Sequence, residues 1–233
     1  MAHYNGRLVE LLLEPYQNAA ARIACPAQAV PKPGQYLQAH QPNQPLEVTP
    51  TSLFRAGESH PAGDGGLSFP VAGPLPEDWQ PGTELKLRGP LGRGFELPKH
   101  LRRLALIALV DSPARLIPLI SIGLERDAEL VLVCDAPVGA LPLAVEQQSL
   151  ADLPKALAWA DFLAIDIALE RLEELVDFLV TKGRTRAPKG QALVFSPMPC
   201  CGLAKCGVCS LKTKNGARLA CEDGPVFKLE ELI

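Results

Sequence analysis

The residues best suited to chemistry are cysteines near the C-terminus, and their spacing indicates a metal or cluster site. Three lie close together and one follows at a distance, in the pattern C-x4-C-x2-C-x11-C; they are Cys201, Cys206, Cys209 and Cys221. Plant-type [2Fe–2S] sites use these short spacings with a distant fourth thiolate. Gly202 and Gly207 supply the permissive backbone that lets a loop wrap a cluster and aim N–H groups at sulfur. The pattern therefore predicts a [2Fe–2S] cluster.

Zinc and disulfides are the alternatives for these thiols. Structural zinc sites usually pair two short C-x2–4-C knuckles, whereas here three ligands stand together and the fourth is alone. The chain has 7 cysteines, an odd number that argues against a disulfide framework. No secretory signal opens the sequence, so we expect a reducing cytoplasm, where clustered cysteines bind metal more often than they pair.

The other cysteines and the histidines show no ligand spacing. Cys200 is one thiol more than a four-ligand site needs, and we interpret it as a small buried residue beside the cluster rather than an alternative ligand. Cys25 and Cys134 lie in strand-like runs and are expected in the core. The histidines are scattered and are expected at the surface or in loops; they are His3, His40, His60 and His100.

Charge and hydropathy limit the classes of partner. The 233 residues have a net charge of -3 at pH 7, so nothing indicates nucleic acid. No uninterrupted run of about 20 apolar residues would cross a membrane. Basic residues flank the ligands; they are Lys205, Lys212, Lys214 and Arg218. They either offset the negative charge of a thiolate-bound cluster and guide a redox partner, or form a solvated basic loop.

Residues 1–100 have the texture of an antiparallel β domain. Short apolar or alternating runs, such as ARIACPA, QYLQAH and TELKLRG, are separated by Pro, Gly and Asn at about ten-residue intervals. This spacing predicts a small barrel or sandwich. Pro50, Pro74 and Pro90 each lack a ladder donor, so we expect them at strand ends or in turns.

Residues 101–196 have a different texture. Continuous apolar runs predict strands that are buried on both faces; they are 104–110, 129–135, 161–167 and 191–195. Between the last two, a stripe of Leu169, Leu172, Leu175, Val176 and Leu179 predicts a helix that Gly183 can cap. Strands alternating with helices indicate a doubly wound parallel sheet. Residues 197–233 then form the cysteine-rich cluster domain.

The C-terminal motifs resemble a known family. "CGLAKCGVC" and "CEDGPVF", with "PGQYL" (33–37) and "GPLGRGF" (89–95), are similar to the electron-transfer subunit of class B dihydroorotate dehydrogenase. Ala204 replaces the second glycine of that family's C-G-x-G-x-C-x-x-C, a mild departure provided this position is not at positive φ.

This resemblance implies a ferredoxin-reductase-like fold, in which a β-barrel binds FAD, an α/β domain approaches NADH and a C-terminal domain carries the [2Fe–2S] cluster. It also implies that electrons pass through the FAD and the cluster to a flavin in a partner subunit, commonly in pyrimidine biosynthesis.

The flavin motifs of that family are incomplete here. Its R-P-x-S segment aligns with residues 49–52, which places Thr49 where an arginine meets the FAD phosphates. Arg55 is nearby, although its position along a strand points it to the opposite face from Ser52. The second phosphate element aligns with "GPLP" (73–76), whose two prolines remove N–H donors. FAD binding is left open, with contacts expected at Thr51, Ser52, Leu53 and Gly73.

The nicotinamide motifs are absent. Where the family has G-G-G-x-G-x-x-P after its first α/β strand, this chain has "ALVDSPARLIP" (108–118), which contains no glycine and in which Asp111 would repel phosphate. The family's C-G-P aligns with "IDI" (165–167). The sequence therefore predicts that NAD(H) does not bind.

Three functions follow from these motifs. The first is an iron–sulfur electron-transfer subunit that works with a flavoprotein dehydrogenase and without NAD(H). The second is a complete FAD-dependent reductase subunit. The third is a non-redox scaffold or sensor whose four cysteines hold a structural metal. No residue is expected to make or break substrate bonds, and the sequence leaves the oligomeric state open.

Overall fold

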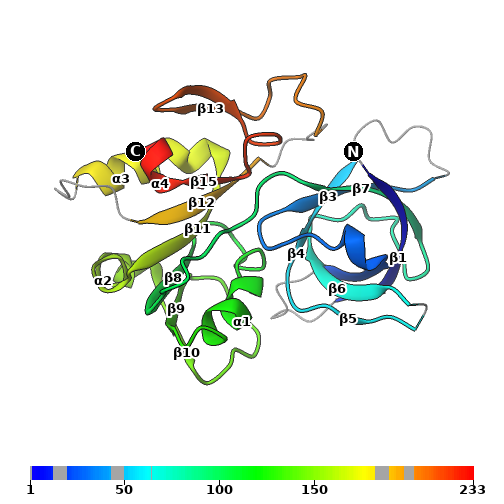
Figure 1. The fold of residues 1–233 in the computed structure, drawn as a ribbon, viewed down its shortest axis with the longest axis horizontal. Coiled ribbons are helices and arrows are strands. Elements are labelled where there is room, and N and C mark those ends of the chain that lie inside the picture. The colour runs from blue at the N-terminus through cyan, green and yellow to red at the C-terminus, as the bar shows by residue number, and fades with distance from the viewer. Residues whose placement is uncertain (1, 13–19, 43–49, 64, 182–188, 197–201) are drawn as a thin grey trace.

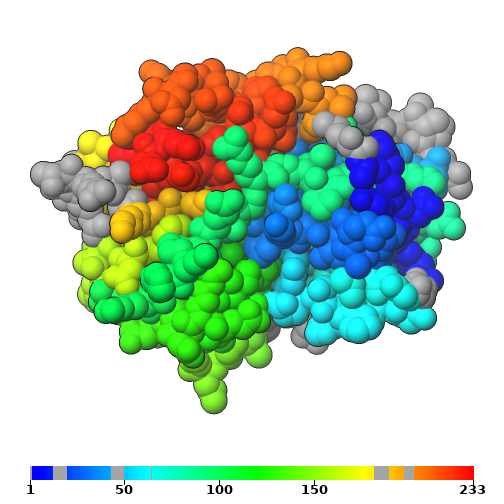
Figure 2. Space-filling view, viewed as in Figure 1, coloured from blue at the N-terminus to red at the C-terminus, as the bar shows by residue number. Residues whose placement is uncertain are grey.

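The computed structural model describes residues 2–12, 20–42, 50–63, 65–181, 189–196 and 202–233. A β-barrel, drawn in blue and cyan, stands beside an α/β sheet drawn in green and yellow (Figure 1). The C-terminal segment, drawn in orange and red, lies along one side of the molecule and touches both parts (Figure 2).

The N-terminal domain is an antiparallel barrel, as its spacing of strands predicts. Its strands are β1 (His3–Leu11), β2 (Ala21–Cys25), β3 (Tyr36–His40), β4 (Thr51–Arg55), β5 (His60–Pro61), β6 (Leu67–Ala72) and β7 (Glu84–Leu91). They pair in the order β2-β1-β7-β3-β4-β6, β2 and β6 close the barrel, and β5 pairs with β6 outside it. Alternate residues such as Leu37, Leu53 and Leu87 are fully buried and fill the interior.

The α/β domain has the predicted parallel sheet with helical crossovers. Its elements are β8 (Arg103–Ala108), α1 (Pro118–Leu124), β9 (Glu129–Val133), β10 (Val145–Gln148), α2 (Leu153–Trp159), β11 (Phe162–Ala168), α3 (Leu172–Thr181) and β12 (Gly190–Phe195). Within the described residues, single 3-10 turns lie at Ala27–Ala29, Leu150–Asp152 and Leu169–Arg171. The sheet order is β10-β9-β8-β11-β12-β15, so the direction of winding changes between β8 and β11.

Helix α3 buries the predicted leucine stripe. Leu172, Leu175 and Leu179 lie in the same core cluster as the sheet strands, because residues three or four apart share one helix face. The predicted cap at Gly183 lies outside the described residues. Among the helices that the structure describes, none is long and apolar enough to cross a membrane.

The C-terminal segment forms a hairpin and then rejoins the sheet. The hairpin strands are β13 (Ser210–Thr213) and β14 (Gly216–Leu219), and they are followed by β15 (Val226–Lys228) and α4 (Leu229–Leu232). Strand β15 pairs antiparallel with β12. Buried Phe227, which contributes about 1.5–3 kcal/mol by burial, helps to anchor this segment on the sheet. The domain boundaries at 100/101 and 196/197 stay predictions, although the last strand belongs to the α/β sheet.

Candidate cluster and flavin site

The β13–β14 hairpin brings two of the predicted ligands together. Cys209 immediately precedes β13 and Cys221 lies just beyond β14, so the antiparallel pairing places them side by side. The Cys221 backbone N–H donates a hydrogen bond to the Cys209 Sγ at 3.5 Å. Both side chains are buried. N–H donors to sulfur are the usual second layer of an iron–sulfur site, because they stabilise negative charge on the thiolate.

The other two predicted ligands are not placed at this point. Cys206 is exposed on the preceding loop, and Cys201, like Cys200, lies outside the described residues. Within the part of the chain that the structure describes, no three metal-ligating side chains converge. The two buried thiols and the N–H···S hydrogen bond fit an iron–sulfur cluster. The four-ligand set stays a prediction.

The loop that carries Cys206 depends on left-handed backbone. Gly202 has φ 56 and Gly207 has φ 72, so both adopt the left-handed backbone that glycine permits. Ala204 also has φ 56. The replacement of glycine by Ala204 is therefore not mild, because a non-glycine residue at positive φ costs about 1–2 kcal/mol.

The remaining cysteines and the histidines lie where the sequence predicts. Cys25 and Cys134 are buried in the cores of the two domains. Burial raises the pKa of the Cys25 thiol to about 12 and also raises the pKa of Cys134, so neither is a reactive thiolate. The histidines are all exposed; they are His3, His40, His60 and His100.

The paired cysteines face the barrel across a small cavity. This cavity, of about 30 Å³, is lined by Cys209 and Cys221 on the C-terminal segment and by Tyr36, Ser52 and Phe54 on the barrel. The Tyr36 hydroxyl donates a hydrogen bond to the Cys221 carbonyl oxygen at 3.0 Å. The cluster segment and the flavin-like strand β4 are thus neighbours, and a side chain ties them together.

Three of the predicted flavin residues lie on β4, and Gly73 lies just beyond the adjoining strand β6. Thr51 and Ser52 are half-buried, whereas Leu53 points into the barrel core and offers only its backbone. Gly73 follows Ala72, which pairs with Phe54, so Gly73 lies beside β4 at the start of a turn. The structure therefore assembles all four predicted positions in one place, and FAD contact with them stays a prediction.

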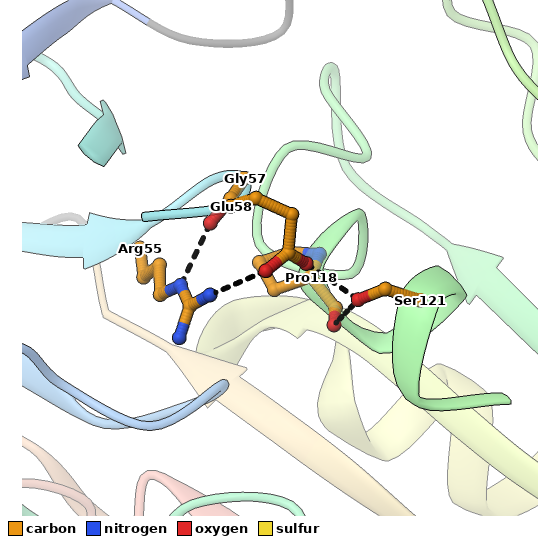
Figure 3. A network of polar contacts seen from close by, with 5 residues as sticks. All are labelled: Arg55, Gly57, Glu58, Pro118 and Ser121. Carbon is orange, nitrogen blue, oxygen red and sulfur yellow. Dashed lines mark hydrogen bonds and ion pairs between the residues drawn. The ribbon is translucent and has the colours of Figure 1, made fainter. Parts of the chain in front are cut away.

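Arg55 serves a different contact. Its Nε donates to the Gly57 carbonyl at 2.7 Å and its Nη2 to the Glu58 carboxylate at 2.9 Å. The Ser121 hydroxyl of α1 donates to the other Glu58 oxygen at 2.5 Å (Figure 3). The Arg55 guanidinium is thus engaged where the barrel meets α1, so it is not free to replace the arginine that the family has at Thr49. Thr49 itself lies outside the described residues.

A buried ion pair lies at the end of the α/β sheet where dinucleotides usually bind. Doubly wound sheets bind ligands at the carboxyl ends of the strands where the winding reverses, which here is between β8 and β11. Arg115, in the loop after β8, donates to both carboxylate oxygens of Asp166 on β11, at 2.8 and 3.1 Å. The two side chains are only 8% and 0% exposed.

Aromatic rings on both domains enclose this cation. The Arg115 guanidinium carbon lies 4.1 Å from the centre of the Phe195 ring and 5.6 Å from that of Phe54. Burial raises the pKa of Asp166, and the Arg115 charge opposes that rise. Sequence reasoning missed the pair, although an aspartate within an otherwise apolar strand was the available signal. The pair thus packs where the sheet meets the barrel, against one ring from each.

Comparisons with known proteins agree with this architecture. Residues 198–233 match the family model for the iron-sulfur cluster binding domain of dihydroorotate dehydrogenase B. The electron transfer subunit of dihydroorotate dehydrogenase B (NAD(+)) from Clostridium acetobutylicum is 27% identical over 164 residues, 65% of this chain and 66% of that relative. The match thus spans just under two thirds of the relative's length.

Solved structures share the fold. An NADH-dependent reduced ferredoxin-NADP oxidoreductase has a TM-score of 0.68 at 17% identity, covering 97% of this chain and 88% of its own. The ferredoxin reductase in carbazole 1,9a-dioxygenase has a TM-score of 0.58 at 13% identity, covering 78% and 65%. The predicted resemblance is confirmed: the chain has a ferredoxin-reductase-like fold, and its C-terminal segment matches an iron–sulfur cluster binding domain.

Proposed function

We propose that this homologue of the dihydroorotate dehydrogenase B electron-transfer subunit is an iron–sulfur electron-transfer subunit that does not take electrons from NAD(H). Its cluster is of the [2Fe–2S] type and is held by Cys201, Cys206, Cys209 and Cys221. The observation that carries the proposal is the pairing of Cys209 with Cys221, through an N–H···S hydrogen bond, within the segment that matches the cluster-binding model.

A bound [2Fe–2S] cluster supplies one-electron transfer. The residues of this chain orient it: the β13–β14 hairpin fixes two thiols, and the Tyr36 hydroxyl holds the Cys221 backbone against the barrel. Cys209 and Cys221 line a cavity together with Ser52 and Phe54. Electron exchange between the cluster and a group on β4 therefore has a short path.

The proposal excludes NAD(H) on two grounds. The loop after β8 has side chains where the backbone would have to approach a pyrophosphate. In addition, the Arg115–Asp166 pair lies at the ligand-binding end of the sheet and packs against Phe54 of β4. Electrons enter or leave through a partner instead.

The partner is a flavoprotein dehydrogenase subunit, and the cluster segment is its docking surface. Leu203 and Val208 are 48% and 49% exposed and flank the exposed Cys206. Four cations are exposed on the same segment, and residues 196–221 contain no aspartate or glutamate; the cations are Lys205, Lys212, Lys214 and Arg218. An apolar centre with a charged rim is typical of such interfaces.

We propose the reducing cytoplasm as the compartment, where thiolate ligands stay available.

A second candidate is a complete FAD-dependent reductase subunit. It is favoured by the position of Ser52 on the wall of the cavity that Cys209 and Cys221 also line, with Thr51, Leu53 and Gly73 close to Ser52 along β4 and beyond β6. In that case FAD is held by backbone groups and Ser52, without the phosphate-binding arginine.

One measurement separates these functions. Anaerobically purified protein is examined by ultraviolet–visible spectroscopy, and its iron, zinc and flavin contents are determined. A broad red-brown spectrum with about two irons per chain and no flavin supports the cluster-only subunit. Stoichiometric flavin favours the complete reductase, and zinc without iron favours a structural site and contradicts both.

A further inference from the structure

A buried amide links the flavin-like strand to an arginine of the neighbouring strand. Gln38 on β3 is only 1% exposed, and it is paired in register with Arg88 on β7. Its Nε2 donates to the Ser52 hydroxyl at 3.1 Å, and its Oε1 accepts from the Arg88 Nη2 at 3.4 Å. Because both ends of the amide are engaged, Gln38 fixes the position of the Arg88 guanidinium.

The Arg88 guanidinium lies against the cluster loop. A Cβ atom added to Gly202 would lie 2.7 Å from the Arg88 Nη2 and 3.3 Å from the Gln38 Cδ. The loop backbone therefore packs directly on this cation, with no side chain between them. Gly202 immediately follows Cys201, one of the predicted ligands.

This charge differs from the other cations near the cluster. Arg88 is half-buried between the barrel and the loop, whereas the lysines and arginine of the cluster segment are exposed and screened by salt. An arginine remains protonated at every relevant pH. A four-thiolate [2Fe–2S] cluster goes from two to three negative charges on reduction, so a fixed neighbouring cation favours the reduced state.

We propose that Arg88 raises the reduction potential of the cluster and that Gln38 is the residue that positions it. This inference rests on the proposed function, because it needs a redox-active cluster. Arg88 acts through its charge and donates to no substrate. It therefore makes the barrel part of the cluster's electrostatic environment, whether or not the barrel holds a flavin.

The test is the reduction potential of the cluster in the full-length protein, measured by spectroelectrochemistry after iron analysis. Arg88→Gln is expected to shift the reduction equilibrium about tenfold toward the oxidised cluster, about 59 mV for a one-electron couple. Arg88→Lys, which keeps the charge, is expected to retain most of the wild-type potential. Lys86→Gln, which removes an exposed cation two residues from Arg88 on the same strand, is the matched control and is expected to shift the equilibrium less than about twofold.

Each outcome decides a separate point. An unchanged potential in iron-loaded Arg88→Gln overturns this inference and leaves the proposed function standing. Equal shifts in Arg88→Gln and Arg88→Lys also overturn it, because the charge would then not be the cause. If Arg88→Gln fails to retain iron, the Gln38→Met variant serves as the test instead. It is expected to lower the reduction potential by a smaller amount, and an unchanged potential overturns the inference. Wild-type protein without iron refutes the proposed function itself.

Discussion

Replacing Arg115 by methionine removes the cation from the buried ion pair that packs between the sheet and the barrel. Asp166 is then left with no exposed surface and without the two hydrogen bonds that it accepts from Arg115. Breaking such a buried pair from one side costs about 3–5 kcal/mol. For a chain of this size, each kcal/mol lowers Tm by about 2–4 °C, so Tm should fall by roughly 6–20 °C.

The stability lost in Arg115→Met depends on pH, because the pKa of Asp166 determines when its buried carboxylate is charged. Burial already raises this pKa in the folded wild type, so the folded state binds the proton more tightly than the unfolded state. The stability that Asp166 gains by binding this proton is therefore fully present below its pKa in the unfolded state. It is lost as pH rises through its pKa in the folded state. Without Arg115 the pKa of Asp166 rises further, because the Arg115 charge and hydrogen bonds lower it. The deficit of Arg115→Met should thus shrink as pH falls.

Urea unfolding followed by circular dichroism at pH 8 and pH 5.5 measures this effect. The double variant Arg115→Met with Asp166→Leu fills the same space with apolar groups and should regain most of the lost stability. Lys155→Met, which breaks the exposed contact with Asp152, is the control and should leave the free energy of unfolding nearly unchanged. The reasoning is refuted if the loss of unfolding free energy in Arg115→Met, relative to wild type, is as large at pH 5.5 as at pH 8. It is also refuted if the double variant is as unstable as the single one.

Three further outcomes are expected from the cluster segment. Cys209→Ala should abolish cluster assembly, whereas Cys200→Ala should leave the visible spectrum nearly unchanged; a colourless Cys200→Ala protein would show that the ligand assignment is wrong by one residue. Ala204→Gly should stabilise the loop by about 1 kcal/mol, since glycine adopts positive φ without strain, and a slower loss of iron to a chelator measures this. Tyr36→Phe should cost about 1–3 kcal/mol by leaving the buried Cys221 carbonyl without its hydrogen bond; unchanged urea unfolding of the iron-loaded variant would contradict that role.

Local patterns in the sequence predicted most of the architecture. The continuous apolar runs correspond to β8, β9, β11 and β12, because strands covered on both faces admit no regular polar positions. Strand β10 was not predicted, since VEQQ at the edge of the sheet faces solvent and has no apolar pattern. Residues 226–228 were predicted only as part of the cluster domain, yet they form β15 in the α/β sheet, because a three-residue strand carries no sign of which sheet it will join.

The candidate site divides in the same way. Cysteine spacing is a property of a short segment, so the chain itself indicated thiolate chemistry and the positions of the four predicted ligands. The partners of that segment are remote: Tyr36 and Cys221 are 185 residues apart, and Arg115 and Asp166 are 51 residues apart. No local periodicity encodes such pairs.

The sequence by itself therefore determined the two kinds of sheet, the cluster motif and the loss of a glycine-rich dinucleotide loop, because each of these depends on residues close together in the chain. Only the tertiary structure decided which side chains pair at the carboxyl ends of β8 and β11, which cation lies against the cluster loop and that Ala204 adopts a left-handed backbone. Those features arise where the barrel, the sheet and the C-terminal hairpin meet, and the packing of these three elements sets them.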